Sequence, residues 1–545
     1  MKVLRRQHPP PGGEPGSGAD DELLVAPERR TRKARAAPRS VVGISMILVS
    51  VGAWLGADAL ASVDAAELTG GNVPVNEGAI DPRDISAHNS PTLVQNPTNA
   101  ANVVVANRID TPRFSCALHV SFDGGASFSQ TPLPVPAGEP PKCYAPDAAF
   151  SSDGTLYVSF VTLIGRGNVP HAVWISSSDD GGATLSEPAR AQGDLSFQVR
   201  LAAHPEIADK LYLTRLDARE VALYRFTTTG NPIRASVSDD GARTWSYPRI
   251  VTPAARERVV AGSPAVAPDG TLHVAYLDVG DDRLDYEGGH EGLGGPPHPG
   301  RWQLVMASSH DDGRTWTETA VDYIVPTERF LAFLPPFPTV AAGPDGSLYV
   351  AFHDGRAGDA DVYLWRSDDG GRTFGRATRV NDTVPGDGTA QRLPKVSVAP
   401  DGRVDVVYYD RRADEDDVMT EVSLQSSYDR GATFTDHRVL SDRPFDSTIG
   451  FGSDRDMPDL GSRLGLLSTD DKAMAVWTDT RAGTSASNKQ DLVRALVSFP
   501  RPPLLTAAQR DAVHAGAAVV AVLGAALVAW AVAARLRRRT APVPA

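Results

Sequence analysis

The sequence predicts an all-β chain that folds as a β-propeller and carries a hydrophobic helix on either side of it. Three observations support this prediction. A short turn motif recurs six times, pairs of alternating apolar strands lie between its copies, and two long uncharged stretches flank the repeats. The 49 Gly and 43 Pro among 545 residues agree with it, because these residues favour turns and interrupt long helices.

The first 57 residues are predicted to form a tail and then a hydrophobic helix. Residues 1–40 combine nine Lys or Arg with five acids, Pro and Gly, which is a composition typical of disorder. Residues 41–57 carry no charge, which suits either a retained signal-anchor or a cleaved signal peptide with Ala59-Leu60-Ala61 as its cleavage site. The sequence favours neither alternative.

Residues 512–534 are predicted to form a transmembrane helix. Its uncharged part runs from Ala515 to Ala534, and the tail at residues 535–545 has four arginines among its first five residues. Both hydrophobic stretches therefore have basic residues on their outer ends, and the positive-inside rule places both tails in the cytoplasm unless the N-terminal stretch is cleaved. We expect a cell-membrane protein whose central part is extracytoplasmic.

The recurring motif is Ser-x-Asp-x-Gly-x-Thr-aromatic. Its starting serines are 57, 60, 71, 58 and 60 residues apart, a period that suits one propeller blade. The Ser and Asp side chains are expected to bond a local turn, while Gly supplies a permissive backbone and the aromatic packs between sheets. The complete copies start at Ser309, Ser367 and Ser427, and copies with one substitution start at Ser121, Ser178 and Ser238. We expect the motif to be structural rather than catalytic.

Between the motifs, apolar residues alternate around Pro-Asp-Gly turns, as in the stretch from Pro338 to Phe352. This pattern predicts two antiparallel strands, with a third strand leading into each motif and a fourth following it. Such units occur seven times, so we favour seven blades over six. The last unit lacks the motif, and residues 72–77 are expected to supply its fourth strand, which closes a propeller over residues 72–499.

These motifs resemble the Asp boxes of the sialidase and BNR-repeat superfamily of β-propellers, over about residues 72–499. The resemblance implies a fold rather than a reaction. Sialidases of this family are six-bladed exo-glycosidases that hold a sugar carboxylate with three arginines and use a Tyr–Glu nucleophile pair with an Asp acid/base. The family's Phe/Tyr-Arg-Ile-Pro motif is absent here, and the nearest string, Asn107 to Asp110, follows a second strand.

Function is expected on the face opposite the Asp boxes, where loops between second and third strands meet loops between blades. Arg200, Arg392 and Arg455 precede first strands there and, by the resemblance, would clamp an acidic sugar. Three Asp-x-Arg pairs follow second strands and supply further substrate-binding arginines, namely Asp354 with Arg356, Asp410 with Arg412, and Asp479 with Arg481. The first two of these aspartates are catalytic candidates. Structural ion pairs between neighbouring loops are the alternative that we favour.

Two loops add acidic residues. A long loop at residues 278–301 contains Tyr286 and Glu287, which resemble a nucleophile and its activating base, although adjacent side chains point in different directions. A shorter loop, Asp414 to Asp417, has oxygen ligands that would suit Ca²⁺, but a solvated acidic loop is the favoured alternative. We therefore predict no metal site and no cofactor.

The net charge of −13 argues against a nucleic-acid-binding surface. Only two cysteines occur, which excludes multi-cysteine zinc and iron–sulfur sites. In an oxidising compartment Cys116 and Cys143 are expected to form a disulfide, with two buried free thiols as the alternative. Motifs typical of nucleotide binding, zinc proteases and serine hydrolases are absent.

Two functions remain for this predicted membrane-anchored monomer. One is a sialidase-like propeller that acts on or binds glycans, in the first case as an exo-glycosidase. The other is a non-catalytic surface propeller that binds a protein or polysaccharide partner. Hydrolysis of a fluorogenic sialoside or glycoside would distinguish the two.

Overall fold

The computed structural model describes residues 39–61, 67–81, 83–219, 230–282, 298–327, 336–450, 452–453, 460–499 and 505–539. The chain divides into two compact units. One contains most of the helices α1 (Arg39–Ala61) and α2 (Ala507–Arg539), and the other is the β-rich part Asp58–Arg510.

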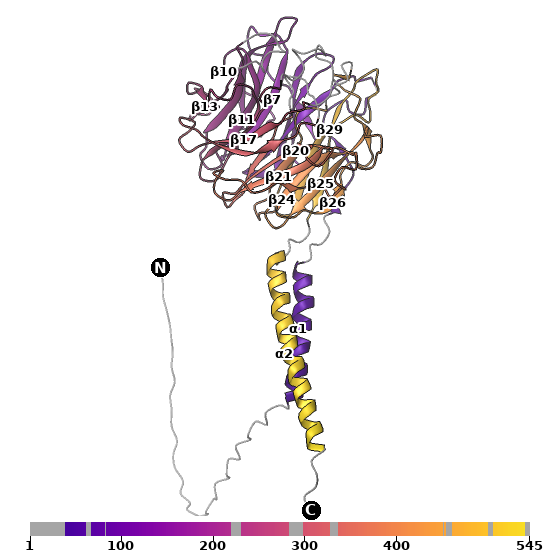
Figure 1. Ribbon diagram of the computed structural model, residues 1–545. Coiled ribbons are helices and arrows are strands. Elements are labelled where there is room, and N and C mark those ends of the chain that lie inside the picture. The colour runs from indigo at the N-terminus through magenta and orange to yellow at the C-terminus, as the bar shows by residue number, and fades with distance from the viewer. Residues whose placement is uncertain are drawn as a thin grey trace, which may run out of the picture. The chain divides into compact units, whose positions relative to one another are not determined.

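The β-rich unit is a seven-bladed propeller (Figure 1), so the predicted fold class and blade number are confirmed. The first strands of neighbouring blades contact one another in a closed ring that runs from β3 through β28 and back to β3. The later strands of each blade follow outward from that ring. The ring of first strands therefore surrounds the propeller axis.

The strands of the first four blades follow the chain order. Blade 1 contains β3 (His88–Asn96), β4 (Asn99–Ile109), β5 (Ser115–Ser121) and β6 (Ser129–Thr131). Blade 2 contains β7 (Cys143–Phe150), β8 (Leu156–Ile164), β9 (Val169–Ser178) and β10 (Ala189–Gln192). Blade 3 contains β11 (Ser196–Ala203), β12 (Leu211–Asp217), β13 (Ile233–Ser238) and β14 (Arg249–Ile250). Blade 4 contains β15 (Val259–Val266), β16 (Leu272–Asp278), β17 (Trp302–Ser309) and β18 (Thr317–Ile324).

The last three blades complete the ring. Blade 5 contains β19 (Thr339–Ala342), β20 (Leu348–Asp354), β21 (Asp361–Ser367) and β22 (Thr378–Arg379). Blade 6 contains β23 (Gln391–Val398), β24 (Val404–Asp410), β25 (Met419–Ser427), β26 (Thr435–Val439) and β27 (Phe445–Asp446), which pairs with β25. Blade 7 contains β28 (Gly465–Ser468), β29 (Lys472–Asp479) and β30 (Asp491–Ser498).

The N-terminal part of the chain closes blade 7. Two short strands, β1 (Glu67–Leu68) and β2 (Val73–Pro74), both pair antiparallel with β30. The predicted closure by residues 72–77 is therefore confirmed, and β1 extends it. This pairing covers the edge of the last sheet, which would otherwise be open to association with another chain.

The Asp boxes form the hydrogen-bonded turns that the sequence predicts. In the copy that starts at Ser309, the serine hydroxyl donates to Asp311 and accepts from the backbone N–H of Gly313, and Thr315 donates both its N–H and its hydroxyl to Asp311. The bonds from Thr315 are the main reason that the pKa of Asp311 is lowered to about 2. The carboxylate is thus fixed within its own turn.

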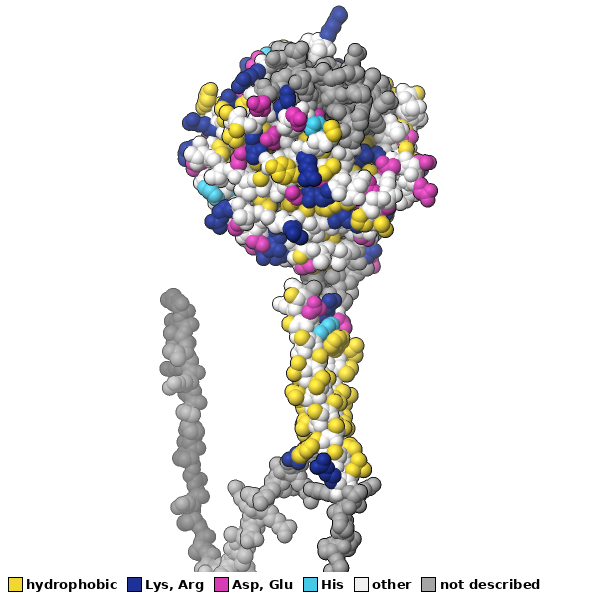
Figure 2. Space-filling model, in the orientation of Figure 1, with side chains coloured by type: hydrophobic (Ala, Val, Ile, Leu, Met, Phe, Trp, Pro, Cys, Tyr) yellow, Lys and Arg dark blue, Asp and Glu magenta, His cyan; other side chains and the backbone are white. Residues whose placement is uncertain are grey.

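Both helices are long and apolar enough to cross a membrane, over Arg39–Asp58 and Ala508–Arg537. They include the two uncharged stretches of the sequence, and Figure 2 shows hydrophobic side chains along the pair with basic side chains toward its ends. Residues 1–38 and 540–545 lie outside the described residues. The placement of the propeller outside the cytoplasm stays a prediction.

Candidate functional site

The first strand carries a β-bulge at an equivalent place in five of the seven blades. In blade 1 the pairing of β3 with β4 shifts between Asn89 and Thr92, and Ser90 inside the bulge has a φ of 54°. The same shift around a left-handed residue occurs in β7, β11, β15 and β23. Because a bulge re-aims the side chains beside it, the residue that follows can leave the alternating apolar pattern.

A polar residue stands two positions after the left-handed residue in each of these strands. Blade 7 repeats the spacing, with Gly461 at a φ of 98° and Arg463 two positions later. We call these six residues the axial residues, and they are Thr92, Asp147, Arg200, Ser263, Lys395 and Arg463.

Contacts of the axial residues join blades that are not neighbours in the ring. Arg200 of blade 3 lies with Nη1 3.4 Å from the Oγ1 of Thr92 in blade 1. Arg463, which precedes the first strand of blade 7, donates to the carbonyl oxygen of Pro146 in blade 2 at 2.6 Å. A further blade lies between the members of each pair, so these contacts form where the first strands converge on the axis.

Asp147 is the buried carboxylate of this cluster, at 1% exposure. It accepts the hydroxyl of Thr92 at 2.7 Å and the backbone N–H of Leu201 at 2.8 Å, and Arg200 lies 3.1 Å from it. Arg463 donates through Nε to the same threonine oxygen at 3.0 Å. Both arginines are therefore held in place by one Thr–Asp pair.

The axial residues carry three positive charges against one negative charge. Besides Arg200 and Arg463, the amine of Lys395 belongs to the cluster, and burial, followed by the charge of Arg200, lowers its pKa to about 8. The side chain of Arg200 is 13% exposed and lies 5.6 Å from the ring centre of Phe337. Charges in such a poorly hydrated place attract an anion more strongly than surface charges do.

The three arginines predicted to clamp a sugar are placed differently from one another. Arg200 is an axial residue. Arg392 precedes the left-handed Leu393, is 26% exposed, and lies 3.9 Å from the carboxylate of Asp417. Arg455 lies outside the described residues, so whether the three converge stays a prediction. The cations that lie near Arg200 are instead Lys395 and Arg463, which were not predicted from the sequence.

Each Asp-x-Arg pair ties the end of a second strand to the outer strand of the preceding blade. Arg356 bonds Asp354 at 2.6 Å and lies 3.0 Å from Asp322 near the end of β18. The two other pairs repeat this arrangement, with Arg412 between Asp410 and Asp382 and Arg481 between Asp479 and Asp442. The structure thus supports the alternative that these arginines form ion pairs between blades.

The two catalytic candidates on these strands are buried. The side chains of Asp354 and Asp410 have no exposed surface. Burial acts to raise the pKa of Asp410, but the hydrogen bond with His437 and the charge of Arg412 outweigh it, so that the pKa is lowered. An ionised and paired carboxylate suits structural ion pairing better than proton donation.

The candidates on the two acidic loops are only partly described. Tyr286 and Glu287 lie outside the described residues. Asp414 accepts the backbone N–H groups of Val418 and Met419, and Asp417 pairs with Arg411 at 3.0 Å. Among the residues that the structure describes, no group of three or more His, Cys, Asp or Glu is placed to hold a metal ion.

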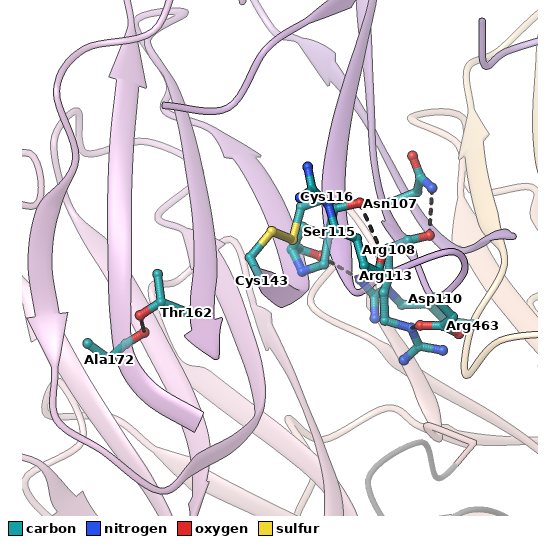
Figure 3. The surroundings of a disulfide bond; sticks show 11 residues. Asn107, Arg108, Asp110, Arg113, Ser115, Cys116, Cys143, Thr162, Ala172 and Arg463 are labelled. Atoms are coloured by element: carbon teal, nitrogen blue, oxygen red, sulfur yellow. Dashed lines mark hydrogen bonds and ion pairs between the residues drawn. A yellow bond between two sulfur atoms is a disulfide. The ribbon is translucent and has the colours of Figure 1, made fainter. Parts of the chain in front are cut away.

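Cys116 and Cys143 are joined by a disulfide that links β5 of blade 1 to β7 of blade 2 (Figure 3). Near it, Arg108 and Asp110 form a buried ion pair at 2.7 Å. Burial raises the pKa of Asp110, although the charge of Arg108 opposes the shift. Figure 3 also places Arg463 beside this pair. The disulfide joins the two blades that contribute Thr92 and Asp147 to the axial residues.

Residues 225–462 match the family model of the BNR repeat-like domain. No curated protein matches the chain. Among solved structures, a protein of unknown function from Dyadobacter fermentans is 15% identical with a TM-score of 0.43, and the match covers 80% of this chain and 100% of that protein. An α-L-arabinanase from Penicillium chrysogenum is 15% identical with a TM-score of 0.40, covering 66% of this chain and 94% of its own. The endosialidase of phage phi92 is 10% identical with a TM-score of 0.44, covering 81% and 70%.

At these TM-scores the three likenesses carry no argument about activity. The family match, the six Asp boxes and the closed ring of blades agree with one another. The chain is therefore a seven-bladed β-propeller whose residues 225–462 are similar to the BNR repeat-like domain.

Proposed function

We propose that this protein is a membrane-anchored, extracytoplasmic propeller that binds acidic glycans at its axis. The observation that supports the proposal is the excess of positive charge among the axial residues, where Arg200, Lys395 and Arg463 surround the single carboxylate of Asp147. Arginine forks bind carboxylates through two parallel hydrogen bonds, and a lysine adds a point charge. The match to the BNR repeat-like domain makes glycans the ligand class to test first.

Binding without turnover is the function that we favour. Most glycosidases place two carboxyl groups on either side of the scissile bond, roughly 5 to 9.5 Å apart. Asp147 is the one carboxylate among the axial residues, and Thr92, Leu201 and Arg200 already engage it. Exo-glycosidase activity of the sialidase type is the second candidate, because Tyr286 and Glu287 in the sequence resemble a nucleophile and its activating base.

A binding measurement on the detergent-solubilised full chain tests the proposal. Oligosaccharides that carry a carboxylate would be compared with the same compounds after reduction of the carboxyl group to an alcohol. We expect binding of the acidic forms alone, and a loss of at least tenfold in affinity in Arg200→Gln, since a charge-assisted bidentate contact disappears. The control is Arg83→Gln, because the side chain of Arg83 is 93% exposed.

Two results would contradict the proposal, namely equal binding of the acidic and reduced forms, or an unchanged affinity in Arg200→Gln. The same samples would be incubated with a fluorogenic sialoside. Release of the fluorophore would establish the exo-glycosidase in place of the binding protein.

A further inference from the structure

We infer that α1 is retained in the mature protein and pairs with α2 as an antiparallel two-helix membrane anchor. The inference rests on the membrane-anchored part of the proposed function. It selects the retained anchor over the cleaved signal peptide, between which the sequence does not choose.

Small residues at a spacing of seven form the buried face of each helix. On α1 these are Gly43, Ser50 at 4% exposure and Ala57 at 3%. On α2 they are Ala517, at 7% exposure, and Gly524. A repeat of seven keeps one face of a helix turned toward a partner along its length, and small side chains let two backbones approach closely within a membrane.

The backbones of the two helices meet at Gly43 and Gly524. A Cβ added at Gly43 would lie 2.6 Å from the carbonyl oxygen of Gly524, and one added at Gly524 would lie 2.8 Å from the carbonyl oxygen of Gly43. These distances are too short for any real Cβ, so larger residues would force the helices apart. Glycines elsewhere on the helices, such as Gly52 and Gly516, have no atom within 4 Å of such a Cβ.

Aromatic contacts join the helices on either side of the glycine contact. The guanidinium of Arg39 lies 4.1 Å from the ring centre of Trp530, and Trp54 stacks on His514 with ring centres 4.1 Å apart. The 15 residues from Arg39 to Trp54 span about 22 Å of helix. Trp side chains near both ends of an apolar span, with Arg at one of them, are typical of a helix that reaches the two membrane interfaces.

The polar side chain of Ser50, on the buried face of α1, is satisfied without water. The hydroxyl of Ser50 donates to the carbonyl oxygens of Met46 and Ile47 in the preceding turn, at 3.0 and 2.9 Å. Within lipid, an unsatisfied hydroxyl would cost free energy, so this bonding suits a helix that stays in the membrane. Removal of α1 as a signal peptide would take away the partner of Gly524, Trp530 and His514.

The first test follows both ends of the chain in the cell membrane. A full-length chain with different epitope tags at its termini would be expressed, washed with alkaline carbonate and compared with the unprocessed length. We expect one species that keeps both tags and stays in the membrane fraction. A membrane-bound chain without its N-terminal tag would overturn the inference, whereas release of the chain by carbonate would overturn the membrane anchoring in the proposed function.

The second test is a disulfide across the helix contact. A Cβ at Gly524 would lie 3.1 Å from the Cβ of Met46, so Met46→Cys with Gly524→Cys should cross-link on oxidation with copper phenanthroline. The matched control is Leu48→Cys with Val522→Cys, because these side chains are 67% and 69% exposed and face away from the contact. A protease site inserted after Val384, which is 71% exposed, lets the two halves separate in denaturing sodium dodecyl sulfate unless they are cross-linked.

The native disulfide does not interfere with this readout, because both of its cysteines lie in the N-terminal half. We expect the halves to remain joined without reductant in the contact pair and to separate in the control pair. Separation in both pairs, or a cross-link between two copies of the chain, would overturn the pairing of α1 with α2.

Discussion

Replacement of Lys489 by methionine should loosen the closure of the propeller. Lys489 is 2% exposed and precedes β30, to which the N-terminal strands pair. Its ammonium group donates to the carbonyl oxygens of Gly78, Ala79 and Asp81, at 2.9, 3.1 and 3.0 Å. Methionine fills similar space but donates no hydrogen bond, so three carbonyl groups just after β2 would lose their partner.

The expected loss follows from those three bonds. A hydrogen bond to a charged group contributes about 1.5 to 3 kcal/mol, and bonds in one network are not additive. Loss of one partner from a buried charged site costs about 3 to 5 kcal/mol, so we expect about 4 kcal/mol. For roughly 430 residues between Glu67 and Phe499, the unfolding entropy is about 0.9 kcal/mol per degree, which gives a Tm lower by about 4 °C.

Calorimetry would measure the Tm, and hydrogen exchange would show whether residues 73–81 lose protection. The control is Lys472→Met, because Lys472 lies on β29 of the same sheet but is 53% exposed. Its Tm should stay within a degree of the unmodified protein. If Lys489→Met melted like this control and the exchange of residues 73–81 did not change, the argument that Lys489 holds the closure would be wrong.

Three further predictions concern charged groups. The affinity for an acidic ligand should fall as the pH rises through about 8, because the amine of Lys395 loses its charge there, and titration calorimetry should find a flatter profile in Lys395→Arg. Burial raises the pKa of Asp491 to about 6, whereas the unfolded chain releases this proton near pH 3.8. The stability of the folded state therefore falls as the pH rises from 3.8 to about 6. Asp491→Asn should therefore be more stable above pH 6, by about 1 to 3 kcal/mol, and denaturation curves from pH 4 to 7 should lose this slope. Arg412→Gln should lower the unfolding free energy in urea by about 3 kcal/mol, because Asp410 stays buried without its cation, and should leave ligand affinity unchanged. The first prediction would be wrong if the affinity of the unmodified protein did not change with pH. The second would be wrong if stability changed with pH as much in Asp491→Asn as in the unmodified protein, and the third if Arg412→Gln lost ligand affinity.

Most of the fold could be predicted because each blade repeats local signals. The Asp boxes set the hairpins between third and fourth strands, and the alternating apolar residues set the strand pairs before them. The closing strand was predictable because residues 72–77 resemble the fourth strand of a complete blade around Thr378. The strand β1 was missed, because two residues, Glu67 and Leu68, are too short to show an alternating pattern.

The axial residues were not predicted as a group, because a β-bulge in the first strand interrupts the alternating pattern from which the strands were predicted. A bulge shifts the register by one residue, so the polar side chain that follows does not stand where simple alternation places the inner face. A signal was nevertheless present, since a proline directly precedes Thr92, Asp147 and Lys395 at equivalent places in three blades. Alignment of the blades on that proline would have placed these residues in one ring and added Arg200 and Arg463 at the same position.

The role of an arginine depends on the side chains that it contacts, and a short sequence motif does not show which side chains these are. Asp382 and Asp442 each bond an Asp-x-Arg arginine of the following blade, and they lie 30 and 39 residues before that arginine in the chain. Each of those arginines therefore has two carboxylates, whereas the three axial cations share Asp147. An anion binds weakly beside a guanidinium whose charge two carboxylates already neutralise. Its binding free energy is most favourable where cations outnumber carboxylates in a poorly hydrated place. For this reason we propose the axis, rather than the repeated Asp-x-Arg pairs at the blade ends, as the place where an acidic ligand binds.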